Sequence, residues 1–130
     1  MNKYSFTLAG SLLAILSARI YVLAWGNLSY SFMGYQLHHF YYGLGLLIVA
    51  GILKRMKAPE SLLFFVIGLG LGYIFDEFDL LLSVGHTYTM QLYNAPLNLA
   101  MDVILVLVLL RLNENRNYVH GLLRDAETVL

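Results

Sequence analysis

The sequence contains no cysteine, and this absence removes several kinds of chemistry at once. Without cysteine there is no disulfide, no thiolate zinc site, no iron–sulfur cluster and no covalently attached c-type haem. Charged residues are scarce as well, at 12% of the chain. A soluble domain must keep much of its surface polar, and this composition is too apolar for that. The composition therefore argues against a soluble globular domain.

Apolar residues take the place of the missing charges. They make up 59% of the 130 residues, and the mean hydropathy is +0.68. A helix needs about 20 apolar residues to cross a bilayer. Four runs meet this criterion, at about 6–25, 37–53, 61–82 and 95–112. The first run is too long for a secretory signal, and "LSAR" at 16–19 offers no cleavage site, so we expect a retained helix.

Positive charges are distributed unevenly between the ends of these runs. The link at 54–60 carries Lys54, Arg55 and Lys57, whereas the links at 26–36 and 83–94 contain no Lys or Arg. Basic residues also precede the first run and follow the fourth, at Lys3, Arg111, Arg116 and Arg124. Under the positive-inside rule, both termini and the 54–60 link face the cytoplasm. We predict an all-α, antiparallel four-helix bundle in a prokaryotic cytoplasmic membrane, with residues 1–130 forming one transmembrane domain.

The last part of the chain, 113–130, is predicted to be a cytoplasmic tail. Apolar residues recur there at helical spacing, at Val119, Leu123, Ala126 and Leu130. This pattern is typical of a short amphipathic helix on a membrane surface.

The ionisable residues within the predicted spans share one depth. On two antiparallel helices, residue numbers increase with depth along one helix and decrease along the other, at the same rise per residue. Two residues at equal depth therefore have residue numbers that add up to the same sum throughout that pair of helices. Applied to the three hairpins, this rule predicts a single layer near the outer face. Its members are Arg19, His38, His39, Asp76, Glu77, Asp79 and Asp102.

Helical phase predicts which of these side chains meet. At about 100° per residue, one face of the third span carries Gly68, Gly72, Asp76 and Asp79. One face of the second span carries His39, Gly43 and Ala50. Because small residues let membrane helices approach closely, we expect these two faces to pack together. That packing would direct His39 toward the two aspartates.

The charges of this layer do not balance. Arg19 is the one cation in the layer, against four carboxylates, so about three negative charges remain if all the acids ionise and the histidines are neutral. Imidazoles beside carboxylates are suitable ligands for Zn²⁺, Mn²⁺ or Fe²⁺. We therefore expect a divalent transition metal, with Arg19 supplying charge balance or holding an anionic group. The expected ligands are His39, Asp76 and Asp79, with His38, Glu77 and Asp102 as further contributors.

Haem and nucleotides are not expected as cofactors. The "GLGLG" stretch at 68–72 lies inside an apolar span and does not follow a strand, so it lacks the context of a nucleotide-binding loop. Ligation of haem by two histidines requires that they lie on facing helices. His38 and His39 are adjacent in the sequence and do not meet this requirement.

Three functions remain open from the sequence. The first is a metal-dependent enzyme that acts on a membrane-borne, lipid-like or anionic substrate. The second is a proton- or cation-coupled transporter or channel subunit. The third is an accessory subunit of a larger membrane complex, in which the polar network is structural. We expect the bilayer as a partner together with a homo-oligomer or a larger complex, and no nucleic acid; whether the chain is an enzyme stays open.

Two stretches of the central hairpin carry a resemblance. The "LHHFYYGL" stretch at 37–44 supplies His38, His39 and Gly43, and "GLGLGYIFDEFDLLL" at 68–82 supplies Asp76, Glu77 and Phe78. Together they resemble small prokaryotic membrane proteins that have an H-H-x-x-x-G helix start and a glycine-rich span ending in Asp-Glu-Phe. The resemblance covers about a third of the chain. It implies a polyhelical membrane protein with a site at these residues, and no particular reaction.

Overall fold

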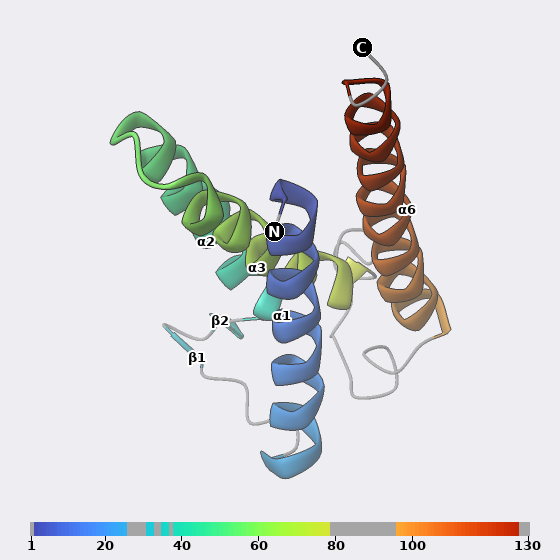
Figure 1. The fold of residues 1–130 in the computed structure, drawn as a ribbon. Helices are drawn as coiled ribbons and strands as arrows, with labels where there is room; N and C mark the ends of the chain where they lie inside the picture. The colour runs from blue at the N-terminus through green and yellow to red at the C-terminus, as the bar shows by residue number, and fades with distance from the viewer. Residues whose placement is uncertain (1, 26–30, 33–34, 37, 79–95, 128–130) are drawn as a thin grey trace.

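The computed structural model describes residues 2–25, 31–32, 35–36, 38–78 and 96–127 (Figure 1). Within these ranges the chain is almost entirely helical, as predicted. The helices are α1 (Lys3–Trp25), α2 (His39–Arg55), α3 (Glu60–Asp76) and α6 (Pro96–Glu127). A short antiparallel pairing joins β1 (Ser31–Phe32) to β2 (Tyr35–Gln36).

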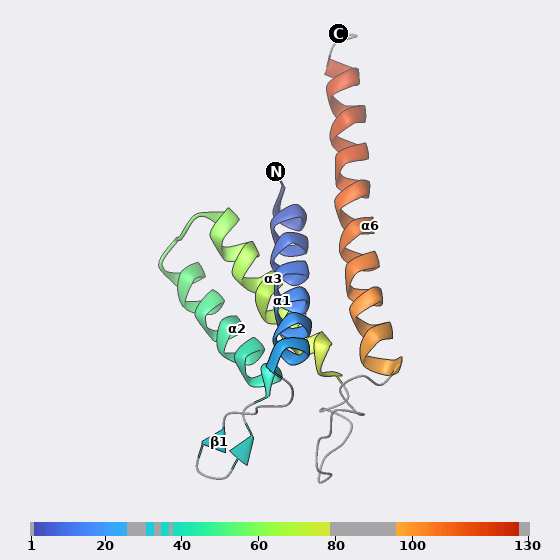
Figure 2. The ribbon, with the colours of Figure 1, turned by 90° about the horizontal axis from the view of Figure 1, so that it is seen from below.

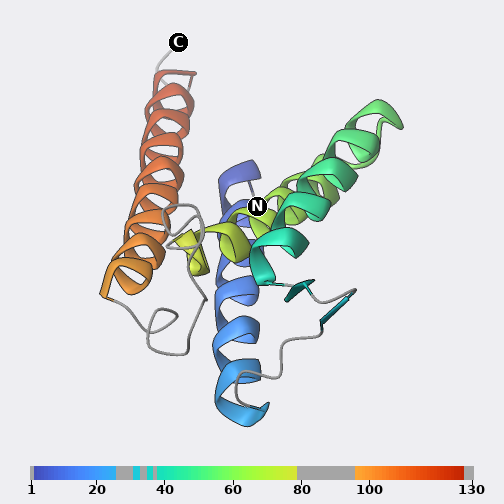
Figure 3. The ribbon, with the colours of Figure 1, turned by 180° about the vertical axis from the view of Figure 1, so that it is seen from behind.

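The centre of the fold is the pair of helices α1 and α3. Helix α2 packs on α3 to form an antiparallel hairpin, and α6 contacts both α1 and α3 from the other side (Figures 1 and 2). Seen from behind, α2 and α6 lie on opposite sides of α1, and the end of α3 reaches toward the start of α6 (Figure 3). The far half of α6 extends beyond the start of α1 (Figure 2). Residues from α1, α3 and α6 therefore meet only along the shared part of the bundle.

Close contact between α1 and α3 depends on small residues from both helices. A Cβ atom at Gly72 would lie 2.6 Å from the carbonyl oxygen of Ser11, and one at Gly68 would meet the carbonyl oxygen of Thr7. The Ser11 hydroxyl donates a hydrogen bond of 3.0 Å to the carbonyl oxygen of Gly68. The α1 surface at this interface continues with Ala14 and Ala18, both buried. The two backbones approach closely because neither helix places a large side chain between them.

This arrangement corrects the expected pairing of glycine faces. Gly68 and Gly72 face α1, whereas α2 packs against Gly70, where a Cβ at Gly43 would lie 2.7 Å from the Gly70 carbonyl oxygen. At about 100° per residue, Gly70 points to nearly the opposite side of α3 from Gly68. Helix α3 lies between two partners and uses glycine toward each of them.

The helix ends also differ from the predicted spans. Helix α3 ends at Asp76, and Glu77 interrupts the helical conformation with φ −121° and ψ 39° inside the predicted span, although Phe78 is helical again. Residues 79–82 lie outside the described part of the chain. Helix α6 runs unbroken to Glu127, so the described part of the predicted tail helix is a continuation of α6.

Among the described residues, two helices, α1 and α6, are long and apolar enough to cross a membrane, over Lys3–Ala24 and Pro96–Asn115. Helices α2 and α3 have 17 residues each, which corresponds to about 25 Å of helix. Large apolar side chains are exposed on each of the four described helices, including Leu23, Ile48, Leu62 and Leu107.

Candidate functional site

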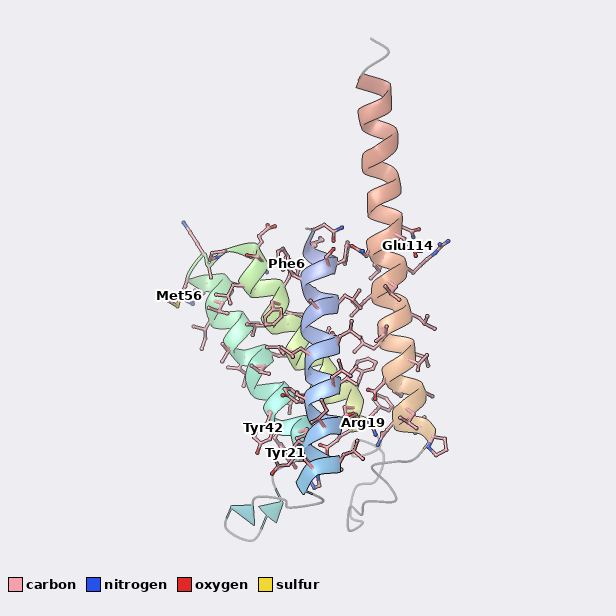
Figure 4. The ribbon with its side chains drawn as sticks, turned by 60° about the horizontal axis from the view of Figure 1, so that its bottom comes forward. Phe6, Arg19, Tyr21, Tyr42, Met56 and Glu114 are labelled. Atoms are coloured by element: carbon pink, nitrogen blue, oxygen red, sulfur yellow. The ribbon has the colours of Figure 1, made fainter. Side chains whose placement is uncertain are left out.

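Six ionisable side chains from four helices and their flanking residues gather at one end of the bundle. We call this group the charge cluster, and its members are Arg19, His38, His39, Asp76, Glu77 and Asp102. Figure 4 shows Arg19 near Tyr21 and Tyr42, at the end opposite to Met56 and Glu114. The carboxylates are deeply buried, with relative exposures of 0% for Asp76, 4% for Glu77 and 7% for Asp102. All six were expected in one layer from the sequence, whereas Asp79 lies outside the described residues.

Arg19 joins three helices through its guanidinium. Its Nε atom lies 2.7 Å from Oδ1 of Asp76 on α3, and its Nη2 donates a 3.0 Å hydrogen bond to Oδ2 of Asp102 on α6. A planar guanidinium presents several donors in a fixed fork, which suits two carboxylates at once. Because Arg19 belongs to α1, this contact ties α6 to the centre of the bundle. Helix α6 is also held near its middle, where the Ser5 hydroxyl at the start of α1 donates to Oδ1 of Asn113 at 2.8 Å.

Glu77 links the start of α2 to the end of α3. Its Oε2 atom accepts a 2.9 Å hydrogen bond from the backbone amide of Phe40, in the first turn of α2. The first amides of a helix have no partner within the helix, and the N-cap residue His38 makes no side-chain cap bond. Glu77 therefore caps α2 from a different helix. The sequence signal for this role is the absence of Ser, Thr, Asp or Asn at the start of α2.

The second oxygen of Glu77 faces both histidines. Oε1 lies 3.5 Å from Nδ1 of His38 and 4.0 Å from Nδ1 of His39. The same Nδ1 atom of His39 is 3.9 Å from Oδ2 of Asp76. His39 therefore stands between the Glu77 side of the cluster and the Arg19 side.

Three tyrosine rings surround His39. The ring centres of Tyr21, Tyr42 and Tyr73 lie 5.8 Å, 6.1 Å and 6.0 Å from that of His39. Tyr73 is oriented by a 3.0 Å hydrogen bond between its hydroxyl and that of Ser17. Because the Ser17 hydroxyl also donates to the carbonyl oxygen of Ala14 at 2.9 Å, Tyr73 is the donor in the Ser17 bond. Neither Tyr21 nor Tyr73 was predicted to belong to the site, although Tyr73 lies one turn before Asp76, the last residue of α3.

The charges of the cluster are only partly compensated. Arg19 supplies one positive charge against three buried carboxylates, which leaves two negative charges when the imidazoles are neutral. Arg19 lies against Asp76 and Asp102, and Glu77 faces the imidazoles. One of the two excess negative charges is therefore shared by Asp76 and Asp102 beside Arg19, and the other lies on Glu77, on the side of the cluster that holds His38 and His39.

The arrangement does not by itself form a metal centre. Within the described ranges, no group of three or more His, Asp or Glu side chains is placed to hold a metal ion. The guanidinium competes for oxygens of Asp76 and Asp102, two of the expected ligands. The metal site stays a prediction from the types of donor present.

Comparisons of the chain with known proteins give no assignment. No protein-family model, no curated protein and no solved structure matches it. The resemblance of the central hairpin therefore stays a prediction, and the functional argument depends on the geometry of the charge cluster.

Proposed function

We propose that the protein is an integral membrane protein with four spanning helices and both termini on the cytoplasmic side. The composition, the two long apolar helices and the exposed apolar side chains on every helix support this. The basic residues of the 54–60 turn lie at the opposite end from the charge cluster, as the positive-inside rule requires for an outward-facing cluster. The charge cluster is then at the outer end of the bundle.

The function that the geometry supports best is reversible binding of a proton at the histidine side of this cluster, in the service of proton- or cation-coupled transport. The observation that carries this proposal is the position of both Nδ1 atoms, 3.5 Å and 4.0 Å from one Glu77 oxygen. A proton taken up by either imidazole adds a positive charge beside the uncompensated carboxylate. Ionisable residues inside membrane spans commonly mark such proton and ion pathways.

The bundle would act as one unit of a larger transport assembly. Between the cluster and the opposite ends of α1, α3 and α6, residues 6–16, 61–72 and 103–110 carry only apolar and small hydroxyl side chains, so a single copy offers no continuous polar route to the cytoplasm along these helices. A second copy or a partner subunit would complete the route. Arg19, Asp76 and Asp102 would hold the helices in place, while Glu77, His38 and His39 exchange protons.

Proton flux through reconstituted protein tests this proposal. Liposomes that contain the protein and an internal pH dye should acidify faster than empty liposomes under an imposed proton gradient. Glu77→Gln keeps the shape of the side chain and removes its charge, so it should reduce the flux to the level of empty liposomes. The matched control is Glu114→Gln, because the Glu114 side chain is 66% exposed and remote from the cluster, and it should leave the flux unchanged. Equal fluxes for wild type and Glu77→Gln would contradict the proposal.

A metal-dependent enzyme acting on a membrane-borne substrate is the second candidate, and one observation favours it. The Nδ1 atoms of His38 and His39 lie 3.5 Å and 4.0 Å from one Glu77 oxygen, and donors of these types suit Zn²⁺, Mn²⁺ or Fe²⁺. These side chains are not placed to hold an ion as they stand, so binding would have to draw them together. Bound metal would supply a Lewis acid at the outer end of the bundle.

Elemental analysis of the purified protein separates the two candidates. The metal proposal expects close to one equivalent of a transition metal in wild type and a clear loss in His39→Ala, since a ligand is removed. A metal content indistinguishable from the buffer, unchanged by added Zn²⁺, Mn²⁺ or Fe²⁺, would remove this candidate and leave proton binding in place.

A further inference from the structure

The turn between α2 and α3 carries a compact set of cations. Lys54, Arg55 and Lys57 are all exposed, and Glu60 is the one acidic residue in the link. Lys54 and Arg55 lie in the last turn of α2, where basic side chains favour the helix dipole. Lys57 lies beyond the helix, in a left-handed conformation with φ 56° that residues other than glycine rarely adopt. The helix dipole therefore does not account for all three charges.

An exposed apolar stripe leads along α2 to this turn. Ile48, Ile52 and Met56 follow one another at intervals of four residues, so they share one face of the helix. Their relative exposures are 68%, 53% and 72%. Met56 lies at the tip of the hairpin, at the opposite end of the bundle from Arg19 (Figure 4). A single helix thus presents an apolar stripe that ends among cations.

We propose that the α2–α3 turn binds an anionic phospholipid. The negative headgroup would be held by Lys54, Arg55 and Lys57, and an acyl chain would lie along the stripe of Ile48, Ile52 and Met56. The charge complementarity is specific to this end, because the other end of the bundle carries the negative excess of the charge cluster. An acidic protein segment would match the cations but would leave the stripe uncovered. A phospholipid matches both features, since its charged and apolar parts are joined in that order.

Other basic residues near this end do not belong to the site. The Nζ atom of Lys3 lies 5.2 Å from the ring centre of Tyr4 and 5.8 Å from that of Phe64, so it is engaged with aromatic faces. Arg111 is 74% exposed and pairs with Glu114 on its own helix at 3.5 Å. Arg111 therefore provides a matched control for the removal of one exposed cation.

The test uses the full chain, purified in a mild uncharged detergent and titrated with phosphatidylglycerol or phosphatidylcholine. Bound lipid is counted by native mass spectrometry. The wild type should retain phosphatidylglycerol at lower lipid concentrations than phosphatidylcholine. Removing one cation should weaken the preference about fivefold, so the triple variant Lys54→Gln, Arg55→Gln, Lys57→Gln should lose it. Arg111→Gln should behave as wild type.

Three results would overturn the proposal. The first is equal retention of the two lipids by the wild type. The second is an unchanged preference in the triple variant. The third is full displacement of phosphatidylglycerol by inorganic phosphate, which would mean that the cations hold a free anion and not a lipid. If the triple variant does not fold, the salt dependence of lipid binding by the wild type replaces it as the test. A preference for phosphatidylglycerol over phosphatidylcholine that persists unchanged in high salt would contradict a site built on exposed charges.

Discussion

Arg19→Met is expected to destabilise the folded protein by about 3–5 kcal/mol, because it leaves buried carboxylates without their cation. The Arg19 guanidinium lies 2.7 Å from Asp76 and 3.0 Å from Asp102, and these side chains are 0% and 9% exposed. Methionine keeps most of the length of the side chain and removes the charge. The measurement is the free energy of unfolding in mixed detergent micelles, where the helical signal is followed as denaturing detergent is added.

The control for this prediction is Arg111→Met. The Arg111 side chain is 74% exposed, and exposed ion pairs contribute less than about 1 kcal/mol, so this variant should resemble wild type. Adding Asp102→Asn to Arg19→Met should recover part of the loss, because one uncompensated charge is then removed. If Arg19→Met is no less stable than Arg111→Met, the charge cluster is not a buried, compensated network.

Gly68→Leu is expected to have the second largest effect, by separating α1 from α3. Even a Cβ atom at this position would lie 2.9 Å from the Cα atom of Thr7 and would meet its carbonyl oxygen. These are backbone atoms, which cannot turn away as a side chain can. Overpacking of a well-packed core typically costs about 1–3 kcal/mol, and a larger side chain against backbone should reach the upper end of that range. The shift would also break the hydrogen bond from Ser11 to Gly68.

Gly45→Leu is the matched control for this substitution. A Cβ atom at Gly45 would have no atom within 4 Å apart from the backbone of its own helix, so a leucine there has room. We expect an unfolding temperature close to that of wild type for Gly45→Leu and a much lower one for Gly68→Leu in the same detergent. Similar temperatures for the two variants would show that the close approach of α1 and α3 is not required for stability.

The sequence predicted the charge cluster better than it predicted the packing around it. The depth of a residue follows from the constant rise of antiparallel helices, so Arg19, His39, Asp76 and Asp102 could be placed in one layer. Which helix lies beside which does not follow from depth. The glycine faces were assigned to the wrong neighbour, because α3 packs between α1 and α2 and carries glycine on both sides.

The roles of individual side chains were harder to predict for a related reason. Glu77 caps α2 through the amide of Phe40, and this contact forms only when the end of α3 meets the start of α2. Apolar composition also gave no sign of the interruption at Glu77, where α3 ends, and residues 79–82 of the predicted third span lie outside the described part of the chain. Apolar composition indicates which residues can face lipid. The position at which a helix ends depends also on the hydrogen-bond partners of its last residues, which composition does not indicate.

The most direct test of the account is the distance between the Arg19 guanidinium and the carboxylates beside it. Solid-state NMR can measure the dipolar coupling between ¹⁵N-labelled arginine side chains and ¹³C-labelled aspartate carboxyl groups in the membrane-reconstituted protein. The account predicts strong coupling in wild type, as the 2.7 Å and 3.0 Å contacts require, and its loss in Arg19→Met. Coupling that is absent in wild type would mean that these side chains do not converge, and the proposed site would not exist.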